Sequence, residues 1–417
     1  MTTPELIVIG GGPAGMMAAG TAGERGASVL LIEKNPRNGK KLLITGKGRC
    51  NVTNDCDRDV FFSHVPVNPK FLYSAFSRFG NRDVMAFFEQ RGVALKVERG
   101  SRVFPVSDKA ADINDALIGY CRDSGVRILR DTVTDILCED GQVTGVQTES
   151  HGAIGCRTLI VATGGLSYPL TGSTGDGYRF ARTAGHTIVP PMPSLVPLVA
   201  AEKDCRDMQG LSLKNVAITV TEADSGREIY TDFGEMLFTH FGVSGPVILS
   251  ASSHMRDGRK KYLLSIDLKP ALRPEQLDAR IQRDFSENIN KNFGNSLAKL
   301  LPQKMISVII KRTGIPFDTK VNMIRREQRL TLVETLKHLT FTIVGFRPIE
   351  EAIITSGGVS VSQVNPRTME SRLMKGLYFA GEVLDVDAHT GGFNLQIAFS
   401  TGRCVGMAAS ERMGHTL

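Results

Sequence analysis

The chain has 417 residues, 41% hydrophobic and 22% charged, with a net charge of +7, as in globular proteins of two or three domains. No apolar run reaches the roughly 18 residues that span a membrane, and the seven scattered cysteines form no CxxC pair. These features exclude a membrane partner, a disulfide framework and a metal site, and they favour a cytoplasmic location.

The first elements form a strand, a helix and a strand. Residues 5–9 predict a buried strand that begins too close to Met1 for a signal peptide. Residues 13–26 predict a helix rich in Ala and Gly, and residues 28–33 predict a second buried strand. Further helices are predicted at 69–79, 81–91 and 109–124, and strands at 93–97, 102–106, 126–129, 132–149 (a hairpin) and 157–165.

The pattern changes after the stretch PPMPSLVPL at 190–198, which predicts a domain boundary. Residues 195–268 predict short strands and turns, and residues 274–337 predict basic helices. Past Pro348 the glycine-rich strands return, followed by a closing helix at about 394–412. The sequence therefore predicts one nucleotide-binding domain built from both chain ends and interrupted by an insert.

A dinucleotide-binding motif opens the chain. Gly10, Gly12 and Gly15 form G-x-G-x-x-G between the first strand and its helix, and Glu33 ends the second strand. In this context the glycines permit a tight turn, approach of the backbone to a pyrophosphate and close packing of helix on strand. The helix N-terminus favours the phosphates, and Glu33 accepts hydrogen bonds from ribose hydroxyls, which indicates NAD or FAD rather than NADP.

The C-terminal stretch GLYFAGEVLDVDAHTGGFNLQIAFSTG favours FAD. It resembles the flavin disulfide-reductase superfamily, in which an AGD strand end binds the ribityl chain and the next helix points its N-terminus at the flavin. The resemblance implies that Glu382 takes the place of that Asp. The superfamily pattern also implies a cofactor cradle in the cationic loop KKLLITGKGRCNVTN, with Lys41 and Arg49 near the pyrophosphate and Cys50 and Asn51 near the flavin ring.

Together these patterns predict an FAD site with twenty residues. They are Gly10, Gly12, Ala14, Gly15, Glu33, Lys34, Lys41, Gly46, Gly48, Arg49, Cys50, Asn51, Val133, Thr163, Gly164, Gly381, Glu382, Gly392, Asn394 and Leu395.

Five motifs make a family recognisable: TGKGRCNVTN, TGSTGDGY with AGH, LFTHFGVSGP, TSGGV with TMESR and GLYFAGE, and GGFNLQIAFSTG. The chain resembles the BaiN/RdsA-type NAD(P)/FAD-dependent oxidoreductases, also called the aminoacetone oxidase family. The resemblance implies an α/β, glutathione-reductase-like, Rossmann-type FAD-binding domain from both chain ends, an inserted β-barrel-like domain and a small helical subdomain. We place these at 1–190 with 346–417, at 191–270 with 330–345, and at 271–329, respectively.

The family's activities leave the reaction open. We favour hydride transfer from NADPH or NADH through FAD to a C=C bond conjugated to a carbonyl, in uracil of ribosomal RNA or in an enone. The alternatives are oxidation of a small amine such as aminoacetone, or a dinucleotide-binding regulator without turnover. Because no second G-x-G-x-x-G stands between a strand and a helix, the nicotinamide donor is expected to visit only transiently.

Four residues are candidates for catalysis. His389 precedes the paired glycines of the last motif, and Tyr168 follows the ATGG strand, so either is a candidate proton donor. His240 lies in the insert and is a candidate acid. Cys50 has no second cysteine at redox spacing, so packing beside the flavin is its alternative role.

The basic segment 269–337 is a candidate RNA contact. It holds fourteen Lys and Arg against seven Asp and Glu, with clusters at Lys311-Arg312 and at Arg325, Arg326 and Arg329. Phosphate contacts would offset the cost of flipping a base out of a helix. A solvated helical surface is the alternative, since the segment has no run of stacking aromatics.

Overall fold

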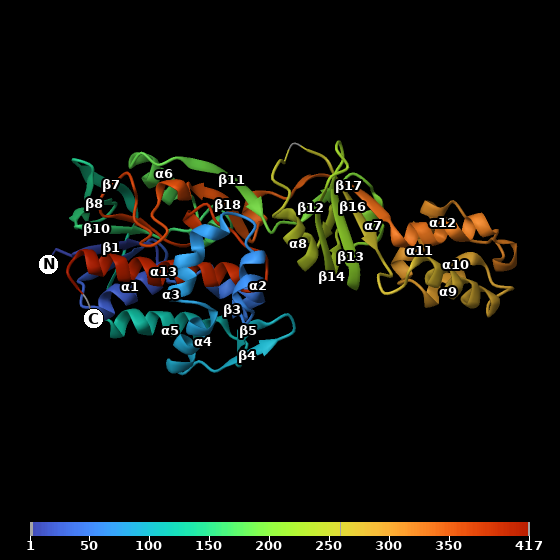
Figure 1. Ribbon diagram of the computed structural model, residues 1–417, viewed down its shortest axis with the longest axis horizontal. Coiled ribbons are helices and arrows are strands. Elements are labelled where there is room, and N and C mark those ends of the chain that lie inside the picture. Colours follow the sequence, from blue (N-terminus) through green and yellow to red (C-terminus); the bar gives the residue numbers. More distant parts are fainter. Residues whose placement is uncertain (1–2, 259, 416–417) are drawn as a thin grey trace. The chain divides into compact units, whose positions relative to one another are not determined.

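The computed structural model describes residues 3–258 and 260–415 (Figure 1). The chain divides into two compact units, each with its own hydrophobic core. The first unit holds the described residues up to Ser194 and from Pro348 onward, and the second unit is Leu195–Arg347. Both chain ends therefore belong to one unit, and the second unit is an insertion.

A five-stranded parallel sheet forms the centre of the first unit, in the order β19-β10-β1-β2-β6. The strands β1 and β10 are uniformly buried, as expected of a parallel sheet covered on both faces. Their bounds are β1 Leu6–Ile9, β2 Val29–Glu33, β6 Arg127–Arg130, β10 Thr158–Val161 and β19 Leu377–Phe379.

Two helices from opposite chain ends pack side by side in this unit (Figure 1). They are α1 (Pro13–Glu24) and α13 (Phe393–Arg412). A Cβ on Gly402 would lie 2.5 Å from the Ala14 carbonyl oxygen, and one on Gly406 would lie 2.6 Å from that of Ala18. The small residues on α13 therefore permit this close helix pair.

Smaller elements complete the first unit. The sheet β7-β8-β9 contains the predicted hairpin, β3-β5-β4 follows the cationic loop, and β11 pairs antiparallel with β18. The strand bounds are β3 Thr53–Asn54, β4 Leu95–Glu98, β5 Arg102–Pro105, β7 Val133–Glu139, β8 Gln142–Thr148, β9 Gly152–Gly155, β11 Ile188–Ser194 and β18 Ile354–Val359. The helices are α2 Arg58–Ser63, α3 Tyr73–Arg78, α4 Asn81–Gln90, α5 Ala110–Asp123 and α6 Asp176–Thr183.

The second unit contains a closed barrel in the order β12-β15-β14-β13-β16-β17. The bounds are β12 Leu198–Ala200, β13 Ser212–Glu222, β14 Glu228–Phe238, β15 Gly242–Ser244, β16 Tyr262–Asp267 and β17 Leu339–Phe346. Two helices accompany it, α7 (Asp204–Asp207) and α8 (Pro246–Ser252). Closure pairs the strands all round and leaves no free sheet edge.

A helical group lies between β16 and β17 in the sequence. It consists of α9 Pro274–Ser286, α10 Phe293–Ser296, α11 Gln303–Thr313 and α12 Arg326–Lys337. Buried Leu277, Ile281, Val308 and Leu332 belong to the same core as the barrel.

The predicted fold class is confirmed: an α/β Rossmann-type domain is built from both chain ends and carries a barrel and a helical group. Two details differ from the sequence prediction. The strands β13 and β14 have 11 residues each rather than being short. Helix α12 continues to Lys337, as the helical pattern over 274–337 predicted, so the domain boundary placed after residue 329 divides this helix. In the described residues, no helix is long and apolar enough to cross a membrane.

Candidate functional site

A long pocket in the first unit opens at the carboxyl ends of β1, β2, β10 and β19. Open α/β sheets bind ligands at this edge. Thirteen of the predicted cofactor residues line it: Gly10, Gly12, Ala14, Glu33, Lys34, Lys41, Val133, Thr163, Gly164, Gly381, Glu382, Asn394 and Leu395.

The N-terminus of α1 faces the pocket. Gly12 is its N-cap residue and Pro13 its first residue, and no side chain caps the exposed N–H groups. A Cβ built on Gly12 meets nothing within 4 Å, so this position is open on the pocket side. The helix end therefore offers free donors and a positive dipole to an anion.

Glu33 is held at the end of β2. Its carboxylate accepts from the Gly11 N–H at 2.6 Å and from the Asn35 N–H and side-chain amide at 2.7 Å each. The side chain is buried, with 9% exposed. These donors fix the carboxylate while leaving acceptor capacity for hydroxyl groups of a ligand.

A loop after β10 is attached to the loop after β2 by lysine contacts. Lys34 Nζ donates to Asp176 Oδ2 and Thr174 Oγ1, both at 2.6 Å. Lys40 Nζ donates to the Leu170 carbonyl at 2.6 Å. Lys34 thus lines the pocket as one member of an ion pair rather than as a free cation.

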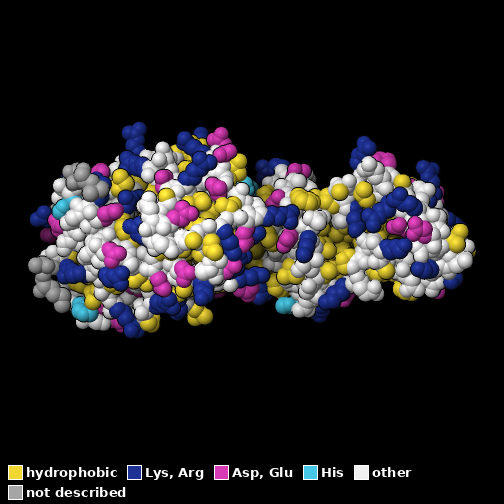
Figure 2. Space-filling view, turned by 90° about the horizontal axis from the view of Figure 1, so that it is seen from below, with side chains coloured by type: hydrophobic (Ala, Val, Ile, Leu, Met, Phe, Trp, Pro, Cys, Tyr) yellow, Lys and Arg dark blue, Asp and Glu magenta, His cyan; other side chains and the backbone are white. Residues whose placement is uncertain are grey.

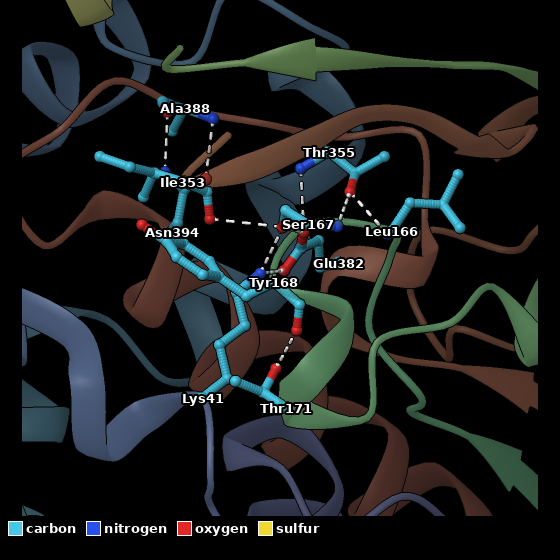
Figure 3. Close-up of polar contacts among 10 residues, drawn as sticks. All are labelled: Lys41, Leu166, Ser167, Tyr168, Thr171, Ile353, Thr355, Glu382, Ala388 and Asn394. Carbon is cyan, nitrogen blue, oxygen red and sulfur yellow. Dashed lines mark hydrogen bonds and ion pairs between the residues drawn. The ribbon is translucent and has the colours of Figure 1, made fainter. Parts of the chain in front are cut away.

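Glu382 connects three segments of the chain (Figure 3). Its carboxylate accepts from Lys41 Nζ at 2.7 Å, from Ser167 Oγ at 2.9 Å and from the Thr355 N–H at 2.9 Å. Thr355 Oγ1 in turn accepts from the N–H groups of Leu166 and Ser167. The sequence prediction gave Lys41 to a pyrophosphate and Glu382 to a ribityl chain. The structure instead pairs them with each other.

The turn before α13 is fixed by Asn394. Its amide donates to the Ala388 carbonyl at 2.7 Å and accepts from the Ala388 N–H at 2.9 Å, as Figure 3 shows. This side chain is therefore engaged within the turn, although Asn394 lines the pocket. The turn holds His389, which is buried and whose N–H donates to the His64 carbonyl at 2.9 Å.

His64 is a neighbour of His389 that the sequence prediction missed. The two rings lie edge to face with centroids 5.4 Å apart, and His64 stacks on Phe393 at 4.5 Å. No sequence motif marked His64, because the contact joins α2 to the turn before α13, far apart along the chain.

The cationic loop is only partly in the pocket, and Gly46, Gly48, Arg49, Cys50 and Asn51 do not line it. Left-handed backbone at Gly46 and Lys47 turns the chain away. Arg49 pairs with Glu98 at 2.5 Å and Asp108 at 2.6 Å, and its guanidinium lies over the Phe104 ring. Arg49, which was expected near the pyrophosphate, is engaged with these two carboxylates outside the pocket lining.

Two glycines in the predicted set have packing roles instead of pocket contacts. A Cβ on Gly15 would lie 1.9 Å from the Gly10 carbonyl oxygen, so Gly15 allows α1 to approach β1. Gly392 caps α13, and a Cβ there would lie 2.3 Å from the Thr53 carbonyl oxygen.

Cys50 does not have the environment of a catalytic thiol. Its side chain is fully buried, and burial raises the pKa of the thiol to about 12. A thiol with this pKa stays protonated and unreactive at neutral pH. The alternative of a packed small residue is the one that the structure supports. Beside it, Asn51 Oδ1 is buried and accepts no hydrogen bond from the described residues.

The remaining catalytic candidates lie outside the pocket lining. His240 belongs to the second unit, where it is exposed in the turn between β14 and β15. Tyr168 is partly buried in the loop after β10, and its N–H donates to the Glu350 carbonyl. His389 and Tyr168 lie on segments that also contribute residues to the pocket lining.

Hydrogen bonds to the buried carboxylate of Asp131 hold the pocket wall near β7. Asp131 accepts from His151 Nδ1 at 2.7 Å and from the Thr132 N–H at 2.8 Å. Burial acts to raise the pKa of Asp131, but these hydrogen bonds outweigh it and hold the pKa well below its usual range. Among the described residues no cluster of three His, Cys, Asp or Glu side chains could hold a metal ion.

Sequence reasoning also missed Asn35, Ser167 and Thr355, which fix the carboxylates of Glu33 and Glu382. Thr355 stands in the motif TSGGV, which was noted for the family resemblance without a role being assigned to its residues.

Comparisons with known proteins agree with this geometry. The family model described as HI0933-like protein Rossmann domain matches residues 4–408. The chain is 33% identical over 401 residues to the ribosomal RNA dihydrouridine synthase of Escherichia coli strain K12, covering 95% of this chain and 96% of the relative. It is 30% identical over 415 residues to the 3-dehydro-bile acid delta(4,6)-reductase of Clostridium scindens, covering 97% and 98%.

A solved structure shares the fold over the whole chain. It is the 3-ketosteroid delta1-dehydrogenase from Sterolibacterium denitrificans, in complex with 1,4-androstadiene-3,17-dione. The TM-score is 0.54 at 13% identity, with 99% of this chain and 100% of the other covered.

Proposed function

Since this chain belongs to the family of HI0933-like Rossmann-domain oxidoreductases, we propose that it is an FAD-dependent reductase of a C=C bond conjugated to a carbonyl. The substrate we propose is a uracil base in ribosomal RNA, and NADPH or NADH is the hydride donor. The observation that carries the proposal is the full-length match to relatives named for such reductions, together with a pocket built for a dinucleotide.

The pocket residues fit FAD. An adenine dinucleotide needs backbone donors for its pyrophosphate, and the open N-terminus of α1 at Gly12 supplies them. It needs a fixed acceptor for ribose hydroxyls, which Glu33 supplies. Thr163 lines the pocket, and its buried Oγ1 has no hydrogen-bond partner in the described chain.

The N-terminus of α13 would favour negative charge on the ring of a bound flavin. Its first turns contribute Asn394, Leu395 and Ile397 to the pocket. When bound, FAD would supply hydride chemistry between a nicotinamide and the substrate.

The chain itself must supply a proton, because hydride adds at the carbon β to the carbonyl and a proton follows at the α carbon. We assign this proton to His389 or Tyr168. The His64 carbonyl and Asn394 hold the His389 backbone in place, which would keep its imidazole oriented. A general acid of this kind typically contributes about 10²–10⁴-fold to the rate.

Uracil and a 3-dehydro-bile acid share one electronic feature, a C=C bond conjugated to a carbonyl. The names of the two relatives point to these two compounds, so one mechanism serves both. The choice of the RNA base over a steroid rests on the higher identity of the RNA-modifying relative and on the basic segment 269–337.

The test has three steps. Purified protein should be yellow and release FAD on heating. NADPH or NADH should bleach the flavin anaerobically, and unmodified ribosomal RNA or an enone should restore its colour. Ribosomal RNA from cells lacking the gene should contain less dihydrouridine. Flavin reoxidation by small amines and O₂ with release of hydrogen peroxide, and none by RNA or enones, would contradict the proposal.

A further inference from the structure

The helical group of the second unit has a shallow hollow between α9 and the segment that leads into α12. We call it the hollow. Both apolar and polar side chains line it, among them Gln282, Phe285, Ile289, Asn322, Ile324 and Arg329. Gln282 and Phe285 lie three residues apart on one face of α9, and Ile289 lies in the turn that follows this helix.

The polar side of the hollow is fixed by Asp278. This carboxylate accepts from Arg329 Nε at 2.6 Å and from the Gln282 amide at 2.8 Å. The hydrogen bond and charge of Arg329 lower the pKa of Asp278. Gln282 therefore donates to Asp278 and leaves its carbonyl oxygen as an acceptor, and the exposed Asn322 amide can both donate and accept.

Arg329 was predicted to contact RNA, but its guanidinium is paired with Asp278. The predicted cluster of Lys311 and Arg312 is likewise paired, since both side chains contact Asp204 at 2.7 Å. Among the described residues, six of the fourteen cations in 269–337 form ion pairs: Arg280, Lys299, Lys311, Arg312, Arg329 and Lys337.

Five exposed cations that adjoin the hollow form no such pair with a described carboxylate: Arg283, Lys291, Lys320, Arg325 and Arg326. We call them the rim cations. The Val321 N–H donates to the Lys291 carbonyl, and Lys320 Nζ donates to the Asn290 carbonyl, so two of them stand together. Figure 2 shows Lys and Arg side chains gathered over the helical group, with fewer acidic ones among them.

We propose that the hollow holds one unpaired base of single-stranded RNA, with the adjoining phosphates on the rim cations. Apolar side chains suit the face of a base, amide groups suit its edge, and positive charges suit its backbone. Ile289 is 52% exposed, which is a surface that a base would cover. The inference rests on the proposed function, because an RNA-modifying enzyme must hold the strand that flanks its target base.

The experiment measures binding of labelled single-stranded and duplex RNA of equal length to the FAD-loaded protein, at several salt concentrations. The rim variant is Arg325→Glu/Arg326→Glu, and the hollow variant is Ile289→Ser/Asn322→Ala. A matched control, Lys109→Glu at the N-cap of α5 with Arg122→Glu in its last turn, makes the same change of net charge at exposed positions of the first unit. Melting temperature and flavin absorbance confirm that each variant is folded.

The wild type should prefer single-stranded RNA. The rim variant should lose at least about tenfold in affinity, and its salt slope should fall by about 1.4, from two lost phosphate contacts. The hollow variant should lose about fivefold or more for single strands, with an unchanged slope and unchanged duplex binding. The control should match the wild type.

Three results would overturn the inference: rim and control variants that bind alike, a hollow variant with wild-type affinity, or competition by heparin equal to that by RNA. Flavin reduction by NADPH or NADH and reoxidation by an enone are measured on the same variants. If the flavin reactions are intact but the hollow variant binds RNA like the wild type, the inference is refuted and the proposed function is not. RNA binding without any reductase chemistry refutes the proposed function.

Discussion

Lys34 and Lys41 in the first unit each contact a carboxylate, of Asp176 and Glu382, whereas Arg325 and Arg326 in the second unit contact none in the described chain. Both pairs lie in segments of the sequence that are rich in Lys and Arg. The pocket lysines hold loops together and leave backbone N–H groups to meet an anion. The exposed arginines adjoin a hollow and keep their charge available. Lysine and arginine content therefore indicates a ligand only where the fold provides no internal partner.

The largest expected effect tests whether the backbone N–H groups at the N-terminus of α1 bind the anion. Gly12→Glu should weaken FAD binding by at least about 100-fold, because its carboxylate would face the pyrophosphate at the open end of α1. The apo protein should keep its melting temperature, since a Cβ at Gly12 meets no neighbouring atom. FAD titration by fluorescence measures the effect, and Gly12→Ala is the matched control.

Unchanged FAD affinity in Gly12→Glu would show that the pyrophosphate does not lie at this helix end. Gly15→Ala should behave differently, by destabilising the apo fold, because its Cβ would collide with the Gly10 carbonyl.

The second prediction breaks the pocket ion pair. Glu382→Gln should lower the free energy of unfolding by about 2 kcal/mol, since Lys41 loses its partner in a partly buried site. FAD affinity should fall with it, because Glu382 connects the loops around the pocket. Denaturant unfolding and FAD titration measure both.

The double variant Lys41→Met/Glu382→Gln should recover part of this loss, because it leaves no unpaired charge. Additive losses of stability in the double variant would mean that Lys41 and Glu382 act independently. The contrast between paired lysines in the first unit and unpaired arginines in the second unit would then fail.

The third prediction concerns pH and the first unit. Burial lowers the pKa of His186 to about 4, and its Nε2 lies 2.7 Å from Ser371 Oγ. The unfolded chain binds this proton at about pH 6.5, so the stability contributed by His186 is present above that pH. It is lost progressively between about pH 6.5 and pH 4, by about 2–3 kcal/mol.

Denaturant unfolding at pH 7 and pH 4.5 measures this loss, and His186→Gln should reduce it. The exposed His240→Gln is the matched control and should leave the pH dependence unchanged. Equal slopes in all three proteins would assign the pH dependence to other groups.

The smallest effect is expected at Cys50. Cys50→Ala should retain turnover within about twofold, because a buried thiol with its pKa raised to about 12 supplies no thiolate at neutral pH. Alkylation of the native protein should instead modify Cys138, the one exposed thiol among the described residues. Loss of flavin reduction in Cys50→Ala would show that Cys50 takes part in the reaction.

Local patterns in the sequence were sufficient for the parts of the fold that short segments specify. The run Leu6–Ile9, the glycines 10, 12 and 15, and Glu33 identified the strand, turn, helix and acidic strand end, because each depends on residues close in the chain. The helical group was also predicted, since its apolar residues repeat at helical spacing. The long strands β13 and β14 were not, because the extended pairing that sustains them is not visible in the sequence.

The sequence by itself determined the dinucleotide motif, the use of both chain ends and the cationic character of two segments. Only the tertiary structure decided which cations are neutralised: Lys41 meets Glu382 across 341 residues, and Lys311 meets Asp204 across 107. The structure likewise turned Arg49 toward Glu98 and placed His64 beside His389. The physical reason is that an ion pair needs its two side chains within about 4 Å, and only the folded chain brings such distant residues together.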